Sequence, residues 1–324
     1  MPDASDADLT RVVAALTRLT EARDARLLLA VSGGPDSMAM LDLIASSWPG
    51  PVHAATVDHG LRPESVDEAA MVADHCANNA IDHALLRPAT PITGSVQSAA
   101  RAARYALLEA HADSIDAAFI VTAHHADDQL ETVLMRLARG SGVDGLAGVR
   151  ARNGRIVRPL LGFRKAELVA HCERRGIPFV QDPSNANPDY DRVRMRQALQ
   201  GFDAVDPLMA GRSASALAEA SEALDWIAMR EAEAVLVRDP EGVRLSQTDY
   251  PSALLRRLLL LALARVQSDI AVRGPALDRL LQTLQRGGQA MIGDVLCGPA
   301  ADGQGWHLRP APPRGASARP DAAE

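Results

Sequence analysis

From residue 27 to about residue 180, short apolar runs alternate with amphipathic stretches, and this pattern restricts the chain to few folds. The run 27–31 is continuously apolar, which is typical of a strand covered on both faces. Strands are also expected at 52–57, 84–86 and 119–122, and helices at 36–47, 65–79, 95–110 and 127–138. Strands and helices alternating at this spacing form right-handed βαβ units around a parallel sheet. We therefore predict an α/β domain with helices on both faces of its sheet.

A smaller, mostly helical domain is predicted to follow, with a boundary near Gly211. After that residue, Ser213 has the side chain of a helix N-cap, and apolar positions repeat with helical spacing. Further helices are expected from Pro251 and Pro275, and short strands near 291–296 and 306–308. The end of the sequence is rich in Pro and Ala, which favours disorder. The predicted organisation is a first domain at 1–211, a second at 212–309 and a disordered tail at 310–324.

The charge distribution indicates an anionic partner. The net charge is −7, yet residues 136–200 hold 13 Arg or Lys and 6 Asp or Glu. A basic block in an acidic protein is a candidate footprint for nucleic acid. No apolar run approaches the roughly 20 residues of a membrane span, and the start lacks the features of a signal peptide. We expect a cytoplasmic protein with no membrane partner.

The three cysteines, Cys76, Cys172 and Cys297, stand singly along the chain. Zinc and iron–sulfur sites use paired cysteines, as in CxxC motifs, and small disulfide scaffolds use more of them. We therefore expect buried structural thiols here.

A phosphate-binding loop is predicted where the first strand ends. Its glycines let backbone N–H groups approach a phosphate closely, and the helix that follows adds its positive dipole end. The two serine hydroxyls can donate to phosphate oxygens. An acid here would repel phosphate unless a cation intervened, which suggests that Asp36 binds Mg²⁺. The loop residues expected to bind ATP are Ser32, Gly33, Gly34, Pro35, Asp36 and Ser37.

Two other nucleotide-binding motifs do not fit. The Walker loop needs a lysine before its Ser or Thr, and Lys165, the only lysine of the chain, follows Phe163-Arg164 instead. The segment 140–145 matches GxGxxG, but it follows a predicted helix rather than a strand. We interpret it as a flexible loop.

The loop at 32–37 resembles the PP-loop of the N-type ATP pyrophosphatases, which bind ATP and transfer AMP to an oxygen, leaving pyrophosphate. The resemblance implies the parallel-sheet, adenine-nucleotide alpha-hydrolase-like fold of that superfamily. Further blocks resemble the tRNA(Ile)-lysidine synthase family in order and spacing, over residues 27 to about 200. They lie at 57–65, 97–105, 122–132, 139–146, 158–161 and 182–185, with Arg192, Arg194 and Arg196 after them.

This family resemblance implies a carbon–nitrogen ligase that acts in two steps. ATP adenylates O2 of the wobble cytidine, position 34, in the CAU anticodon of tRNA(Ile). The ε-amine of L-lysine then attacks C2, which gives lysidine and releases AMP. The implied cofactors are ATP, as co-substrate, and Mg²⁺, and dimers are common among such enzymes.

Carboxylates on one predicted helix suit the amine substrate. Asp128 and Glu131 are three residues apart, hence on one helix face, and can hold a lysine ammonium. Arg104 is a candidate cation for ATP phosphate or the activated intermediate. The resemblance makes Asp36, Arg104, Asp128 and Glu131 the candidate catalytic residues. It also adds Asp58, His59 and Arg62 to the ATP site.

The adjacent His124 and His125 could instead indicate a metal cluster. An adjacent histidine pair is poor ligand geometry, and a metal hydrolase would not need the phosphate loop. Contact of His125 with nucleotide or substrate is the more plausible interpretation.

Four arginines are candidates for tRNA binding: Arg139, Arg192, Arg194 and Arg196. The last three alternate along the chain, so in an extended segment they would point the same way and could follow an RNA backbone. In a helix they would scatter.

Three other functions fit the sequence less well. A tRNA thiolase that installs sulfur usually relies on paired cysteines, which this chain lacks. An amidoligase fed by glutamine would need a glutaminase domain with a nucleophilic cysteine. A non-catalytic RNA-binding module with a degenerate loop would not need Ser32, Asp36 and Ser37 intact.

Overall fold

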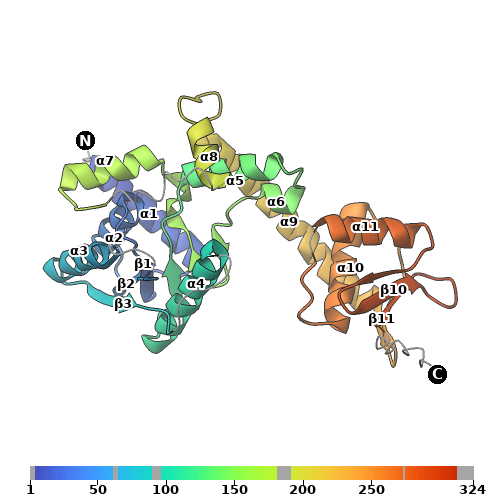
Figure 1. Ribbon diagram of the computed structural model, residues 1–324. Coiled ribbons are helices and arrows are strands. Elements are labelled where there is room, and N and C mark those ends of the chain that lie inside the picture. The colour runs from blue at the N-terminus through green and yellow to red at the C-terminus, as the bar shows by residue number, and fades with distance from the viewer. Residues whose placement is uncertain (1–3, 61–64, 90–95, 181–190, 273, 312–324) are drawn as a thin grey trace, which may run out of the picture. The chain divides into compact units, whose positions relative to one another are not determined.

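A six-stranded sheet organises the first of the two units into which the chain divides, residues 1–218 and 219–324. The computed structural model describes residues 4–60, 65–89, 96–180, 191–272 and 274–311. The strands are β1 Leu27–Ala30, β2 Val52–Val57, β3 Asp82–Leu86, β4 Phe119–Val121, β5 Arg152–Asn153 and β6 Ile156–Val157. They lie in the order β3-β2-β1-β4-β6-β5, and every neighbouring pair is parallel except β5 with β6. Figure 1 labels β1, β2 and β3 of this sheet next to one another.

Helices cover both faces of this sheet. They are α1 Ala4–Thr20, α2 Pro35–Ala45, α3 Ser65–Asn78, α4 Val96–Ser114, α5 Ala126–Leu137, α6 Val143–Leu146, the 3₁₀ helix η1 Pro159–Gly162, α7 Lys165–Arg175 and α8 Asp191–Ala198. Successive side chains of a strand point to opposite faces. Leu27 and Leu29 accordingly pack with α1, α2, α3 and α7, whereas Leu28 packs with α4. The first apolar run is continuous because both faces of β1 are covered.

The predicted α/β architecture is confirmed, and the predicted strands and helices of the nucleotide half lie within a few residues of the observed ones. The third strand is longer than predicted: β3 starts at Asp82, which is exposed, and its first two residues are polar, so they carry no apolar signal. The antiparallel β5 was not predicted. It is two residues long and fully exposed, so it carries no apolar pattern.

The helix expected from Ser213 begins earlier in the chain, so the prediction that Ser213 is its N-cap was wrong. Helix α9 spans Pro207–Val235, starts in the first unit and ends in the second. A carboxylate oxygen of Asp206 accepts a hydrogen bond from the N–H of Leu208 at 2.8 Å, and Pro207 follows as the first helical residue. An acid that caps the free N–H groups and a proline that needs none make a strong helix start.

The second unit combines helices with a five-stranded antiparallel sheet. Its strands are β7 Leu236–Asp239, β8 Gly242–Leu245, β9 Ala290–Ile292, β10 Val295–Pro299 and β11 Trp306–Pro310, in the order β7-β8-β11-β10-β9. Helices α10 Ser252–Val266 and α11 Gly274–Gln285 pack with the sheet in one core. The predicted strand at 291–296 is in fact the β9–β10 hairpin, and β7 and β8 were not predicted. Most of the predicted tail lies outside the described residues.

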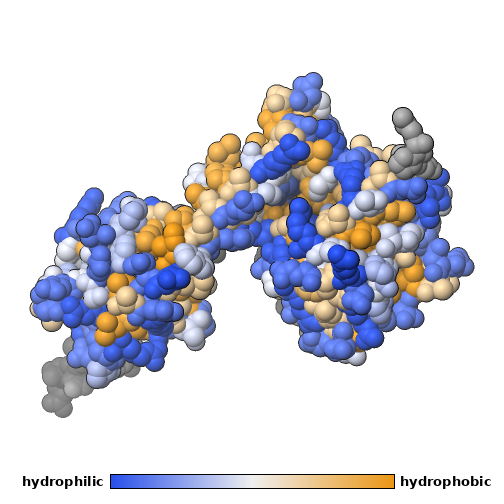
Figure 2. Space-filling view, turned by 180° about the vertical axis from the view of Figure 1, so that it is seen from behind, coloured by the Kyte–Doolittle hydropathy of each residue, from blue (hydrophilic) through white to orange (hydrophobic). Residues whose placement is uncertain are grey.

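The surface is mixed in character. On the face drawn in Figure 2, hydrophobic residues are interspersed with hydrophilic ones over each unit. Several large apolar side chains are exposed, among them Trp226 and Met229 of α9. Across the described residues, none of the helices combines the length and the apolarity that crossing a membrane requires.

Candidate active site

The loop between β1 and α2 has the geometry of an anion site. The Ser37 hydroxyl donates to the carbonyl of Gly34 at 2.9 Å and accepts from the N–H of Ser32 at 3.1 Å. The two serine hydroxyls lie 3.3 Å apart. Pro35, the first residue of α2, has no N–H, and the N–H of Ser37 donates to the carbonyl of Gly34 at 3.1 Å; the N–H of Asp36 lies in the first helical turn, where an N–H has no partner within the helix. These groups and the helix dipole attract an anion at the carboxyl end of β1.

Gly33 gives the loop its shape. Its φ is +83°, in the region that favours glycine, and its carbonyl accepts a hydrogen bond from Val180 at 3.0 Å. A Cβ on this residue would lie 3.4 Å from Cε of Met71 and 3.5 Å from Cγ2 of Val180. The loop is therefore packed from beneath by α3 and by the segment after α7, which leaves its other side for a ligand.

A cavity of about 300 Å³ opens in front of this loop. It lies at the carboxyl ends of β1, β2 and β4, where the crevice of an open α/β sheet binds its ligand. Arg101, Arg104 and Tyr105 of α4 line one side, and the guanidinium of Arg101 lies over the Tyr105 ring at 5.1 Å. Arg104 is exposed to the solvent of this recess, yet the surrounding protein and the charge of Arg101 lower its pKa. Other lining residues are Ser32, Gly34, Asp36, Ser37, Thr122, His124, Asp128 and Arg192.

Asp58 and His59 follow β2 and differ in their hydrogen-bond partners. Both carboxylate oxygens of Asp58 are engaged, by the N–H of Gly60, the hydroxyl of Ser65 and the guanidinium of Arg87, and these bonds lower its pKa. Asp58 therefore holds Gly60, Ser65 and Arg87 together at the end of β2. Both ring nitrogens of His59 are buried without a partner among the described residues, and burial followed by the charge of Arg104 lowers its pKa. A neutral ring with unused nitrogens can bind a ligand. Arg62 lies outside the described residues.

His125 is surrounded by three carboxylates. It is 2% exposed and begins α5, and its ring nitrogens lie 3.5 Å from carboxylate oxygens of Asp36, Asp127 and Asp128. Burial alone would lower its pKa, but hydrogen bonds to Asp127 and Asp36 and the charge of Asp128 outweigh that effect and raise its pKa to about 10. The ring is therefore a cation at neutral pH, and both of its N–H groups donate. The contact of Nδ1 with the N–H of Asp128, at 3.4 Å, is then not a cap, because a protonated Nδ1 cannot accept.

The neighbouring His124 has the opposite character. Burial lowers its pKa to about 4, and the positive charges of Arg158, Arg101 and Arg192 act in the same direction, against Asp128. Nδ1 of this neutral ring lies 3.0 Å from the hydroxyl of Thr122. Two adjacent histidines therefore provide one fixed cation and one neutral ring, which faces the cavity. Within the described residues, no group of three or more His, Cys, Asp or Glu side chains forms a metal-binding cluster.

Asp36 has a carboxylate oxygen that could bind a cation shared with phosphates. Its Oδ1 is buried and has no hydrogen-bond partner among the described residues. Its Oδ2 lies 3.5 Å from His125 and 4.0 Å from Nζ of Lys165. One carboxylate oxygen, completed by phosphate oxygens and water, is the kind of oxygen donor set that Mg²⁺ takes in nucleotide enzymes.

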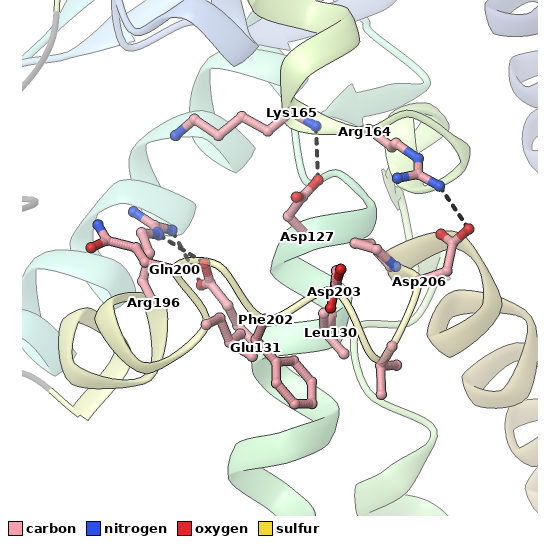
Figure 3. Close-up of a pocket in the computed structure, with 13 residues that line it drawn as sticks. Asp127, Leu130, Glu131, Arg164, Lys165, Arg196, Gln200, Phe202, Asp203 and Asp206 are labelled. Carbon is pink, nitrogen blue, oxygen red and sulfur yellow. Dashed lines mark hydrogen bonds and ion pairs between the residues drawn. The ribbon is translucent and has the colours of Figure 1, made fainter.

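A second pocket, of about 540 Å³, lies on the other side of the α5 N-terminus (Figure 3). Glu131, only 4% exposed, is one of its walls, and Asp127 and Leu130 of the same helix also line it. The guanidinium of Arg196 donates to both oxygens of Glu131, at 2.7 and 3.1 Å. Arg196 also approaches Asp128 at 3.8 Å, so one arginine contacts both acids that were predicted to hold the amine.

The arginines after residue 191 lie on a helix, α8, so the extended arrangement is wrong. Arg192 and Arg196 are one turn apart and share a face. Arg192 donates to the hydroxyl of Thr132 at 2.8 Å and lies 3.5 Å from Glu131. Arg194 points elsewhere and pairs with Asp191, as does Arg139. Helix α8 keeps Arg192 and Arg196 at the acids of α5 and leaves Arg194 exposed.

Two side chains at the site, those of Asp127 and Lys165, were not predicted as site residues from the sequence. Asp127 accepts the backbone N–H of Lys165 at 2.7 Å, and the Lys165 ammonium reaches towards the phosphate loop. The hydrogen bonds from His125 and from Lys165 lower the pKa of Asp127, although burial opposes them. The one available signal was that Lys165 is the only lysine in the chain.

The cysteines are inert. All three are buried, and burial raises the pKa of Cys76 to about 11 and the pKa values of Cys172 and Cys297 to about 12. Thiols with such pKa values hold almost no thiolate at neutral pH, and thiolate is the reactive form. Sulfur chemistry on these residues is disfavoured.

A phosphate loop at the end of a parallel strand, faced by arginines and carboxylates, defines an ATP-using enzyme of the PP-loop class, and the family model of the PP-loop domain matches residues 8–201. Similar proteins include the tRNA(Ile)-lysidine synthases of Zymomonas mobilis, 40% identical over 89% of each chain, and of Novosphingobium aromaticivorans, 44% identical over 91% of this chain and 92% of that one. The chain belongs to the tRNA(Ile)-lysidine synthase family.

Among solved structures, the U34-tRNA thiolase NcsA from Methanococcus maripaludis with its [4Fe-4S] cluster superposes with a TM-score of 0.56. The two proteins are 17% identical, and the match covers 66% of this chain and 79% of the thiolase. This likeness supports the PP-loop fold of the first unit.

Proposed function

We propose that this chain makes lysidine in tRNA(Ile) by ATP-dependent ligation of L-lysine to cytidine 34 of the CAU anticodon. The observation that carries the proposal is the arrangement of two cavities around the start of α5. One has a phosphate loop and the other has a buried acid, Glu131. An ATP-binding cavity next to an amine-binding pocket is what a ligation through an adenylated intermediate needs.

In the first step, O2 of the cytidine attacks the α-phosphorus of ATP. The loop serines and the first turn of α2 bind the phosphates, and Arg104 faces the charge that develops on the transferred group. Asp36 would hold Mg²⁺, which supplies charge neutralisation at the phosphate oxygens when bound. The His125 cation fixes the Asp36 carboxylate and offsets its repulsion of the phosphates. The neutral ring of His59 is available to the nucleotide.

In the second step, the lysine amine attacks C2 and AMP leaves with O2. The amine arrives as an ammonium, which Glu131 and Asp128 attract. It must lose a proton before it can attack, and Asp128 lines the nucleotide cavity and can accept one. In this structure the guanidinium of Arg196 is bonded to both carboxylate oxygens of Glu131, so the substrate ammonium must displace it.

The tRNA contacts are proposed for the exposed arginines. Arg139 and Arg194 both pair with Asp191 at the surface, and exposed ion pairs of this kind are weak. A phosphate can therefore replace Asp191 at little cost, and such contacts position an RNA backbone. Arg192 lines the nucleotide cavity, which supports a contact with the anticodon strand close to the reacting base.

The test is the reaction itself. The protein is incubated with ATP, Mg²⁺, isotopically labelled L-lysine and a tRNA(Ile) transcript with a CAU anticodon, and the digested nucleosides are analysed by mass. A transcript with uridine in place of cytidine 34 is the control. Label in a modified cytidine, with one AMP and one pyrophosphate formed per label, is the expected result. Consumption of ATP without labelled cytidine would exclude lysine ligation and leave adenylation standing.

A further inference from the structure

Lys165 is the only lysine among the 34 Lys and Arg residues of the chain, and it lies beside the phosphate loop. Its backbone is held firmly, because its N–H donates to Asp127 and it is the first residue of α7. The rest of α7 packs on α2: the Cys172 thiol donates to the carbonyl of Pro35, and His171 bonds Asp42 at 2.7 Å. The stem of Lys165 therefore starts from a fixed point relative to the loop.

The ammonium end is less constrained than the backbone. The side chain is 42% exposed, and Nζ lies 4.0 Å from Oδ2 of Asp36, at the limit of an ion pair. A pair this long and this exposed contributes little free energy, so it can be exchanged for a stronger partner. Figure 3 shows the side chain extending from α7 along the wall of the second pocket.

The chemistry of adenylation calls for a cation on this side of the loop. As O2 of the base bonds to the α-phosphorus, the bond from that phosphorus to the bridging oxygen breaks, and pyrophosphate leaves with the electron pair. The phosphate loop itself offers hydroxyls and N–H groups but no positive side chain, and Asp36 is negative. Arg101 and Arg104 approach from α4. Lys165 approaches the phosphate loop from α7, and its ammonium lies next to the carboxylate of Asp36.

We propose that Lys165 is a further catalytic residue: its ammonium moves from Asp36 to the departing pyrophosphate and neutralises it. A compact point charge on a flexible stem suits a contact that forms during the reaction, whereas the arginine fork suits a fixed pair. This proposal rests on the proposed ATP-dependent function, but it concerns the leaving group only. The alternative partner of the Lys165 ammonium is the carboxylate of the substrate lysine, bound in the second pocket.

A single lysine allows a direct binding test. Reductive methylation with ¹³C-formaldehyde keeps the positive charge and gives one ε-dimethylamine resonance, distinct from that of the α-amine. We expect this resonance to shift with magnesium pyrophosphate and with magnesium ATP, and to stay unchanged with L-lysine. A shift with L-lysine alone, or no shift with pyrophosphate in protein that consumes ATP, would overturn the proposal. Protein that consumes no ATP with tRNA would overturn the proposed function instead.

Kinetics give the second test. Lys165→Met should slow tRNA-dependent pyrophosphate release about 100-fold in a single turnover, the usual effect of losing one stabilising group. It should also weaken product inhibition by pyrophosphate about tenfold, with the KM for lysine unchanged. Lys165→Arg should recover at least about tenfold of the lost rate. The matched control is Arg174→Met on the same helix, 47% exposed and paired with Asp8 at 3.7 Å, which should behave as wild type. Equal losses in the two methionine variants, or a change confined to the KM for lysine, would refute the role of Lys165.

Discussion

The charge on His125 makes a prediction about stability that depends on pH. In the folded chain its pKa is raised from its ordinary 6.5 to about 10, and the ring is 2% exposed. Below pH 6.5 the ring is protonated in both the folded and unfolded states, so its full contribution to the free energy of unfolding is present. Above pH 6.5 the unfolded chain releases the proton while the folded chain keeps it. The contribution is therefore lost progressively as the pH rises towards 10.

The size of the effect follows from the linkage slope. One proton held only by the folded state lowers the free energy of unfolding by about 1.4 kcal/mol per pH unit. From pH 7 to pH 9 the loss is about 2–3 kcal/mol, because the folded ring begins to titrate near pH 9. His125→Gln removes the titrating group and leaves Asp36, Asp127 and Asp128 without their shared cation. The variant should therefore be less stable than wild type at pH 7, and this gap should shrink by about 2–3 kcal/mol at pH 9.

The assay is urea unfolding of wild type and variant at pH 7, 8 and 9. The three buried cysteines titrate in the unfolded state near this range, but they are the same in both proteins, so the difference between the curves cancels them. His124→Gln is the matched control: its ring has a pKa of about 4 and is neutral throughout, so its gap to wild type should not change with pH. A constant gap for His125→Gln would refute the assignment of a cation to this ring.

Four further outcomes are expected. Asp36→Ala should abolish adenylation, and with it AMP formation, because it removes the proposed ligand of Mg²⁺; the measurement is tRNA-dependent release of pyrophosphate. Glu131→Ala should raise the KM for lysine about tenfold or more and spare the KM for ATP, and equal loss of adenylation in both variants would contradict this division of roles. Gly33→Ala should lower the free energy of unfolding by about 1–2 kcal/mol in urea, because φ is +83° and space is available for a methyl group. Arg196→Gln should strengthen binding of free lysine measured by calorimetry without tRNA, because it removes the competing cation from Glu131; unchanged affinity would show that the two do not compete.

The phosphate loop could be predicted because all of its determinants are local. A buried strand, two glycines, two serines and a proline at the first helical position lie within a dozen residues, and each has a backbone or hydrogen-bonding reason to be there. The same applies to the βαβ order, which repeats at regular spacing. The start of α9 is also encoded locally, in Asp206 and Pro207, whereas Ser213, which also has the side chain of an N-cap, lies inside the helix.

The electrostatics of the site could not be predicted, because they depend on contacts between distant segments. Glu131 and Arg196 are 65 residues apart, and Asp127 and Lys165 are 38 apart. A carboxylate looks the same in sequence whether or not an arginine covers it. His124 and His125 are adjacent, yet one pKa falls to about 4 and the other rises to about 10, because successive residues face different surroundings. Strands β7 and β8 were missed because β7 is mostly exposed and β8 is only four residues long.

The start of α5 links the two cavities. Successive residues on a helix point about 100° apart, so Asp127 lines the second pocket while Asp128 lines the cavity in front of the phosphate loop. His125 contacts both, and also Asp36 of the phosphate loop. If Asp36 holds Mg²⁺ with ATP, its carboxylate would be shared between that cation and His125, and the ring would then depend more on Asp127 and Asp128. The contacts of His125 therefore connect the phosphate loop with the acid that we propose takes the proton of the amine.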